Sequence, residues 1–74
     1  MLKYGEALRS QREAVGISQL ELSKKIGTSH QNINRWETGD VLPSIDFCVR
    51  MADFYGISLD ELIGRDFIRD TAKA

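Results

Sequence analysis

Polar side chains suited to planar hydrogen bonding gather in residues 28–39, TSHQNINRWETG, as His30, Gln31, Asn32, Asn34 and Arg35. Glutamine and asparagine carry a paired donor and acceptor that match N6 and N7 of adenine, and arginine matches O6 and N7 of guanine. The segment therefore holds the side chains needed to contact base edges. The whole chain nevertheless has a net charge of −1, whereas compact nucleic-acid-binding domains are usually basic.

The charge is unevenly distributed along the sequence. Residues 1–39 hold six lysines and arginines against four acidic residues, whereas residues 40–74 hold four against seven. This asymmetry is mild and, on its own, is weak evidence for any function.

Length and composition indicate one small globular domain. The chain has 74 residues, of which 42% are hydrophobic and 28% charged. Its single cysteine, Cys48, cannot form an internal disulfide, which suits a reducing cytoplasm, and we expect it to be a buried small apolar residue. No apolar run approaches the length of a membrane span, and the first residues lack the apolar region of a signal peptide.

Serine and glycine residues divide the chain into short helices. Ser18 with Glu21, and Ser58 with Glu61, have the spacing of capping boxes, and Ser29 and Ser44 are further candidate N-caps. Glycines mark the ends. The expected helices span residues 3–15, 18–26, 29–38, 44–55 and 58–63. No sustained alternation of apolar and polar residues predicts a strand, so the predicted fold class is all-α.

Helical spacing also predicts the core. The residues expected to face neighbouring helices are Leu8, Ile17, Leu22, Ile26, Ile33, Trp36, Ile45, Cys48, Met51, Ala52, Tyr55, Ile57 and Leu62.

Only Gly27 and Thr28 separate the second and third predicted helices, which is the geometry of a helix-turn-helix. With Ile33 and Trp36 facing inward, the outward face of the third helix carries His30, Gln31, Asn34 and Arg35, with Asn32 at its edge. Gln19 and Ser29, at the starts of the two helices, are placed to bind a phosphate backbone. A polar helix face alone is common on protein surfaces and leaves the function open.

A longer pattern runs through LRSQREAVGISQLELSKKIG, TSHQNINRWETG and LPSIDFCVRMADFYGISLDEL. From about Tyr4 to Ile63 it resembles the helix-turn-helix domains of lambda-repressor and Cro type, often called the XRE family. The resemblance implies a compact five-helix domain over residues 1–64, with the helix-turn-helix at the second and third helices. Residues 65–74 would be a tail that extends the last helix or frays.

The resemblance also implies sequence-specific binding of double-stranded DNA, with residues 29–37 or so in the major groove. It assigns base contacts to His30, Gln31, Asn34 and Arg35, and phosphate contacts to Gln19, Ser29 and Asn32. It further implies a partly buried ion pair between Arg12 and Glu37. A protein of this type would be a bacterial or phage transcriptional regulator, cytoplasmic and associated with the nucleoid.

One position departs from the family pattern. The loop after the recognition helix is often basic in relatives, but here it begins Gly39-Asp40. Asp40 would repel the phosphate backbone and weaken non-specific binding, unless its side chain points away and the loop backbone N–H groups still bind.

Some apolar residues fall outside the predicted core. Phe47 and Phe54 are seven residues apart on one helix face, and Ile63, Phe67 and Ile68 follow them. These five residues could form a homodimer interface that places two recognition helices about 34 Å apart on a palindromic operator. Alternatively, the C-terminal tail folds back over the two phenylalanines. We favour the dimer because contiguous exposed aromatic patches are uncommon on monomers.

The residues predict no catalysis. His30 is the sole histidine and has no second ligand nearby, so no metal site is expected, and neither a nucleophile nor a phosphate-binding glycine loop is evident. We therefore expect no enzyme activity, no cofactor and no small-molecule ligand. Two alternatives to a small DNA-binding regulator remain. The chain could be a protein-interaction module of the same fold, such as an antitoxin or accessory subunit, or one part of a larger regulator.

Overall fold

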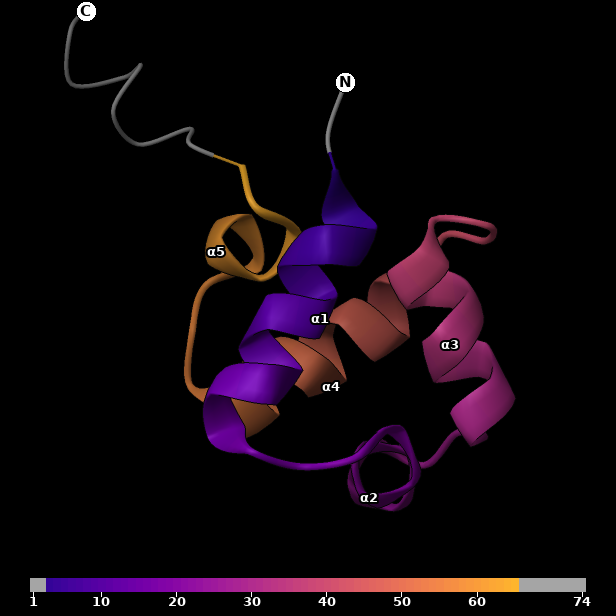
Figure 1. Cartoon of the computed structure of the whole chain (residues 1–74). Coiled ribbons are helices and arrows are strands. Elements are labelled where there is room, and N and C mark those ends of the chain that lie inside the picture. Colours follow the sequence, from indigo (N-terminus) through magenta and orange to yellow (C-terminus); the bar gives the residue numbers. More distant parts are fainter. Residues whose placement is uncertain (1–2, 66–74) are drawn as a thin grey trace, which may run out of the picture.

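Five helices joined by short connections make up the computed structural model, which describes residues 3–65 (Figure 1). They are α1 (Tyr4–Val15), α2 (Gln19–Ile26), α3 (His30–Thr38), α4 (Ile45–Tyr55) and α5 (Leu59–Ile63). No strand occurs within this range, and the all-α class predicted from the sequence is confirmed. The expected tail at residues 65–74 lies outside the described residues apart from Arg65.

Serine side chains begin four of the five helices. The hydroxyls of Ser18, Ser29, Ser44 and Ser58 each accept a hydrogen bond from the backbone N–H three residues on. At Ser18 and Ser58, the side chain of the glutamate three residues on accepts a hydrogen bond from the backbone N–H of the serine, so both predicted capping boxes are present. The caps satisfy N–H groups that a helix cannot pair internally and fix where α2 and α3 begin.

One core joins all five helices, because α1 packs on α3 and α5 while α2 packs on α3 and α4. The buried apolar residues are Leu8, Leu22, Ile26, Ile33, Trp36, Cys48, Met51, Ala52 and Leu62. Ile17, Tyr55 and Ile57 are partly buried against them. Cys48 is buried, as expected, and burial raises the pKa of its thiol.

Two assignments to the core need correction, and both concern the start of α4. Ile45 was expected in the core, but its side chain is 76% exposed. It is the first residue of α4, and helical side chains lean toward the N-terminus, so Ile45 projects beyond the core. Phe47 was expected outside the core, but its ring packs on Trp36 with 5.4 Å between ring centroids. Spacing along a helix does not show where the neighbouring helices end.

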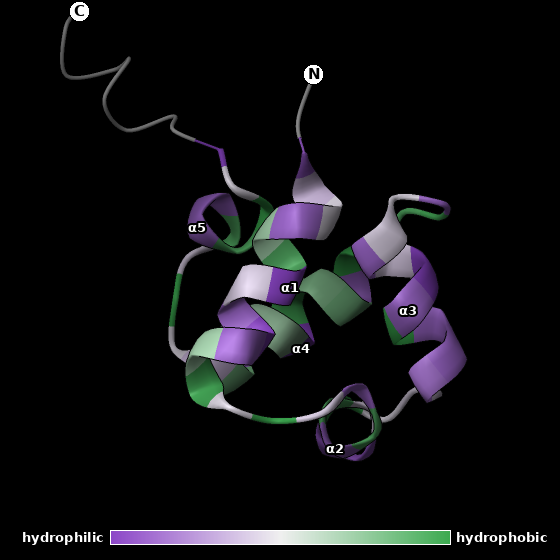
Figure 2. Ribbon diagram, viewed as in Figure 1, coloured by the Kyte–Doolittle hydropathy of each residue, from purple (hydrophilic) through white to green (hydrophobic). Residues whose placement is uncertain are grey.

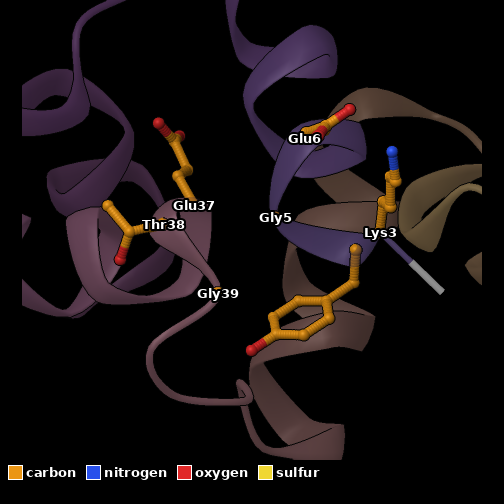
Figure 3. A pocket seen from close by; sticks show the side chains of 7 residues that line it. Lys3, Gly5, Glu6, Glu37, Thr38 and Gly39 are labelled. Carbon is orange, nitrogen blue, oxygen red and sulfur yellow. The ribbon is translucent and has the colours of Figure 1, made fainter. Parts of the chain in front are cut away.

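Gly5 allows the start of α1 to approach the end of α3. A Cβ atom at Gly5 would lie 2.9 Å from the carbonyl oxygen of Trp36 and closer still to that of Glu37. Figure 3 looks into the hollow beside this contact, with Gly5 facing the Glu37–Gly39 segment. The helical pattern of α1 gives no sign of this requirement, because the limiting atoms belong to another helix.

We predict that Gly5→Ala destabilises the domain by about 2 kcal/mol. The steric cost of roughly 1–3 kcal/mol or more against backbone atoms exceeds the helix-propensity gain of about 0.5–1 kcal/mol. Urea unfolding followed by circular dichroism measures the change. Ser10→Ala, at an exposed position of the same helix, should change stability by less than about 0.5 kcal/mol and serves as the control. A Gly5→Ala variant as stable as the wild type would show that α1 and α3 do not approach this closely.

Candidate nucleic-acid interface

The outward face of α3 carries a row of exposed polar side chains. Ile33 and Trp36 are buried, whereas His30, Gln31, Asn34 and Arg35 are exposed, as the sequence predicted. Figure 2 shows much of α3 in the hydrophilic colour, with a pale end next to the following loop. The side chains of His30, Gln31 and Arg35 make no hydrogen bond to other groups in residues 3–65. They are available to an external partner.

Ser29 and Asn32, both expected at a phosphate, also stabilise the turn before α3. The Ser29 hydroxyl accepts from the backbone N–H of Asn32 at 3.2 Å. The Asn32 side chain donates through Nδ2 to the Thr28 hydroxyl at 3.0 Å, a pairing that the sequence did not suggest. The first N–H groups of α3 remain unpaired by the helix itself, as at any helix start. This end of α3 therefore offers donors and a partial positive charge to an anion.

A two-point ion pair joins α1 to α3. Arg12 Nε lies 2.7 Å from Glu37 Oε2, and Arg12 Nη2 lies 2.9 Å from Glu37 Oε1. The side chains are only 12% and 5% exposed. Arg12 Nη1 also donates to the backbone oxygen of Ile17 at 2.9 Å, ahead of α2. One guanidinium thus holds α1, the connection to α2 and the end of α3 together.

The ion pair lies among largely buried groups. The hydrogen bond from Arg12 to Glu37 raises the pKa of the guanidinium, against the opposing effect of burial. Burial raises the pKa of Tyr55 to about 12, and the charge of Glu37 adds to that shift. The Tyr55 hydroxyl is buried and bonds no other group in the described part of the chain. A charge left unpaired in such surroundings would be costly.

Gln19, which the resemblance assigns to a phosphate contact, reaches across to α3 in the free chain. Its Nε2 atom donates to Glu37 Oε1 at 3.1 Å and to Asn34 Oδ1 at 3.4 Å. Gln19 is the first residue of α2, and both of its partners lie on α3. A chain of hydrogen bonds therefore runs from Arg12 through Glu37 and Gln19 to the exposed Asn34.

The loop after α3 places Asp40 in solvent. Its side chain is exposed, while the backbone N–H groups of Asp40 and Val41 donate to the carbonyl oxygen of Arg35 at 3.0 and 3.3 Å. These two N–H groups are thus used to end α3. The idea that they bind a phosphate while Asp40 points away would require breaking these bonds.

The described residues do not assemble the expected apolar patch. Phe47 packs into the core, and Phe54 is 38% exposed beside Lys24 and Lys25. Ile63 lines a different hollow, while Phe67 and Ile68 lie outside the described residues. The two phenylalanines share a helix face, but Phe47 is turned against Trp36. Within residues 3–65, Phe47, Phe54 and Ile63 therefore lie on different surfaces.

A separate apolar hollow of about 770 Å³ lies between the loop after α3, the starts of α1 and α4, and α5. Its lining residues are Tyr4, Gly39, Asp40, Leu42, Pro43, Ile45, Cys48 and Ile63. Leu42 and Ile45 are 71% and 76% exposed. Sequence reasoning missed this surface because it assigned Ile45 to the core.

Within residues 3–65, no three histidine, cysteine or acidic side chains gather in a way that could hold a metal ion. None of the helices described is long and apolar enough to cross a membrane.

The helix-turn-helix family profile matches residues 8–62, so the chain belongs to this family. The chain is a helix-turn-helix domain of the lambda-repressor and Cro type, as the resemblance implied. One relative is the cryptic phage CTXphi transcriptional repressor RstR of Vibrio cholerae. It is 38% identical over 64 residues, which cover 86% of this chain and 57% of RstR. Another is the transcriptional regulator ImmR of Bacillus subtilis, 26% identical, with 88% of this chain and 51% of ImmR covered. The chain spans about half the length of these curated relatives.

Solved structures of regulators share the fold. The P22 c2 repressor in complex with a synthetic operator has a TM-score of 0.79 and 29% sequence identity, with 89% of this chain and 98% of that chain covered. The restriction-modification controller protein C.AhdI of Aeromonas hydrophila has a TM-score of 0.76 and 30% identity, with 82% and 92% covered.

We predict that Arg12→Met lowers the free energy of unfolding by about 3–5 kcal/mol, because the Glu37 carboxylate would stay buried without its partner. Denaturant unfolding measures the loss. The double variant Arg12→Met with Glu37→Met should be more stable than the single variant, since it leaves no buried charge. Arg9→Met is the control, because the Arg9–Glu13 pair is 64% and 54% exposed and such pairs contribute about 0–1 kcal/mol. Equal losses for Arg12→Met and Arg9→Met would contradict a buried structural ion pair.

Proposed function

We propose that this chain binds double-stranded DNA sequence-specifically as a transcriptional regulator, or as the DNA-binding part of a larger one, with α3 in the major groove. The exposed row of His30, Gln31, Asn34 and Arg35 on α3 is the observation that carries the proposal. These side chains can donate and accept at base edges, and the helix that bears them is fixed by a buried core and an ion pair. The operator-bound P22 c2 repressor, which shares the fold, supports the same conclusion.

Contacts to the DNA backbone are part of this proposal. Ser29 and Asn32 lie at the start of α3, where free N–H groups favour a phosphate oxygen. Asp40 would lie close to the same backbone and repel it, so binding should depend on base contacts more than on charge. The protein would act without catalysis or cofactor, in the cytoplasm where a bacterial or phage genome lies.

The proposed regulator acts as a homodimer on a palindromic operator. The apolar hollow described above is the surface we assign to this contact, in place of the phenylalanine patch. A two-fold axis beside it would let Leu42 and Ile45 of each subunit enter the hollow of the other, which gives a closed, self-complementary interface. Such a contact would cover two of the most exposed large apolar side chains of the described residues.

The DNA-binding proposal predicts that Gln31→Ala and Arg35→Ala each weaken binding to a selected operator by at least about tenfold. The operator comes from selection on random oligonucleotides at low salt, and titration of a labelled duplex gives the affinity. Arg9→Ala removes the same charge from an exposed position of α1 and should leave affinity nearly unchanged. Circular dichroism should show an intact fold in all three variants. A wild-type chain that selects no sequence would contradict the proposal and favour a protein-interaction module.

For the dimer, we predict that Ile45→Lys shifts the chain toward monomer, because it places a charge in the apolar contact. Phe54→Lys places the same charge at a less exposed apolar site on the same helix, outside the hollow, so it should leave association unchanged and serves as the control. Sedimentation velocity at several concentrations, with and without operator, measures both. Dimerisation that survives Ile45→Lys but is lost in Phe54→Lys would place the interface elsewhere on α4.

A further inference from the structure

We propose that Gln19 is a positioning residue for base recognition. Glu37 holds the side chain of Gln19 in place, and Gln19 in turn holds the side chain of Asn34. The held Asn34 presents its Nδ2 group to the base edges as a hydrogen-bond donor. This proposal rests on α3 lying in the major groove, and it adds the chemical class of group that Asn34 recognises.

The orientation of the Gln19 amide follows from its partner. An ionised carboxylate only accepts hydrogen bonds, so the atom of Gln19 that faces Glu37 Oε1 at 3.1 Å must be the nitrogen. Glu37 is itself fixed by Arg12, which donates to both of its carboxylate oxygens. The same nitrogen lies 3.4 Å from Asn34 Oδ1, and its second hydrogen can serve that oxygen. The buried ion pair therefore sets which end of Gln19 faces α3.

The same reasoning orients Asn34. Because Gln19 offers a donor, Asn34 must turn its oxygen toward Gln19, and its Nδ2 group then faces elsewhere. Within residues 3–65, this Nδ2 group donates to no other protein group. Asn34 is exposed on the outward face of α3. The contact with Gln19 favours one orientation of Asn34, whereas Gln31 and Arg35 have no such contact, so less ordering is required when DNA binds.

Two consequences distinguish this arrangement from a phosphate contact at Gln19. Its side-chain nitrogen already donates to two acceptors on α3, so a phosphate contact would have to replace one of these hydrogen bonds. Asn34, which presents a donor, matches base edges that carry acceptors in the major groove, such as O6 and N7 of guanine. Cytosine presents only the N4 donor there and is the poorest match. The operator position facing Asn34 should therefore favour guanine and exclude cytosine.

The test compares the wild type with Gln19→Ala, Asn34→Ala and the double variant on operators that differ at each single position. The wild type should favour guanine over cytosine by about tenfold or more at one position, and Asn34→Ala should abolish this preference. Gln19→Ala should reduce the preference for guanine over cytosine below about threefold, and the double variant should show no weaker a preference than Asn34→Ala alone. As a control, Gln19→Ala and Gln31→Ala should act on different positions and combine additively.

Affinity across operators and nuclear magnetic resonance supply independent readouts. Loss of a phosphate contact would weaken binding about equally on every operator, whereas we expect Gln19→Ala to weaken binding mainly on operators that carry the preferred base. In the free protein, Gln19→Ala should shift the side-chain amide resonances of Asn34.

A loss of affinity that is equal on all operators, with an unaltered base preference, would overturn the role proposed for Gln19, as would unshifted Asn34 resonances. Neither result would affect the proposed DNA binding. A wild type that selects no operator would overturn both proposals.

Discussion

The ion pair between Arg12 and Glu37 is the interaction on which the rest of this small domain depends. It lies among largely buried groups, with side chains 12% and 5% exposed, and it joins α1 to the last turn of α3. Gly5 lets α1 approach the same turn, because any larger residue would meet the carbonyl groups of Trp36 and Glu37. A pair this buried contributes less to stability than to orientation, since its desolvation offsets much of its attraction. Its effect is to fix where α3 points.

The Glu37 carboxylate also connects this interior to the exposed face of α3. One of its oxygens accepts from Arg12 and from Gln19, and Gln19 reaches Asn34. A helix of only nine residues thus carries two buried apolar side chains, a buried charge and a row of exposed polar groups. Because these groups share one short rigid element, the exposed row is held in place by the core and not by flexible loops. Precise placement of this kind favours recognition of one sequence over another.

Much of this organisation could be predicted from the sequence. Ser18, with Glu21 three residues on, fixes the start of α2 through local chemistry, and Gly27 ends it in a left-handed conformation at φ 80°. The outward and inward faces of α3 follow from the spacing of Ile33 and Trp36. The failures concern relations between helices. Ile45 has core spacing but lies past the end of the core, and the sequence gives no sign that Gln19 hydrogen-bonds to Glu37 and Asn34 on α3. Spacing cannot show which of several acceptors a side chain meets.

A crystal structure of this chain on its selected operator would test the central claim most directly, namely that the ion pair at Glu37 orients a helix that contacts base edges. We predict α3 in the major groove, with Asn34 Nδ2 donating to an acceptor on a base and the Gln19 amide still bonded to Glu37. A structure with α3 outside the groove, or with the Gln19 nitrogen on a phosphate and Asn34 turned around, would contradict the account.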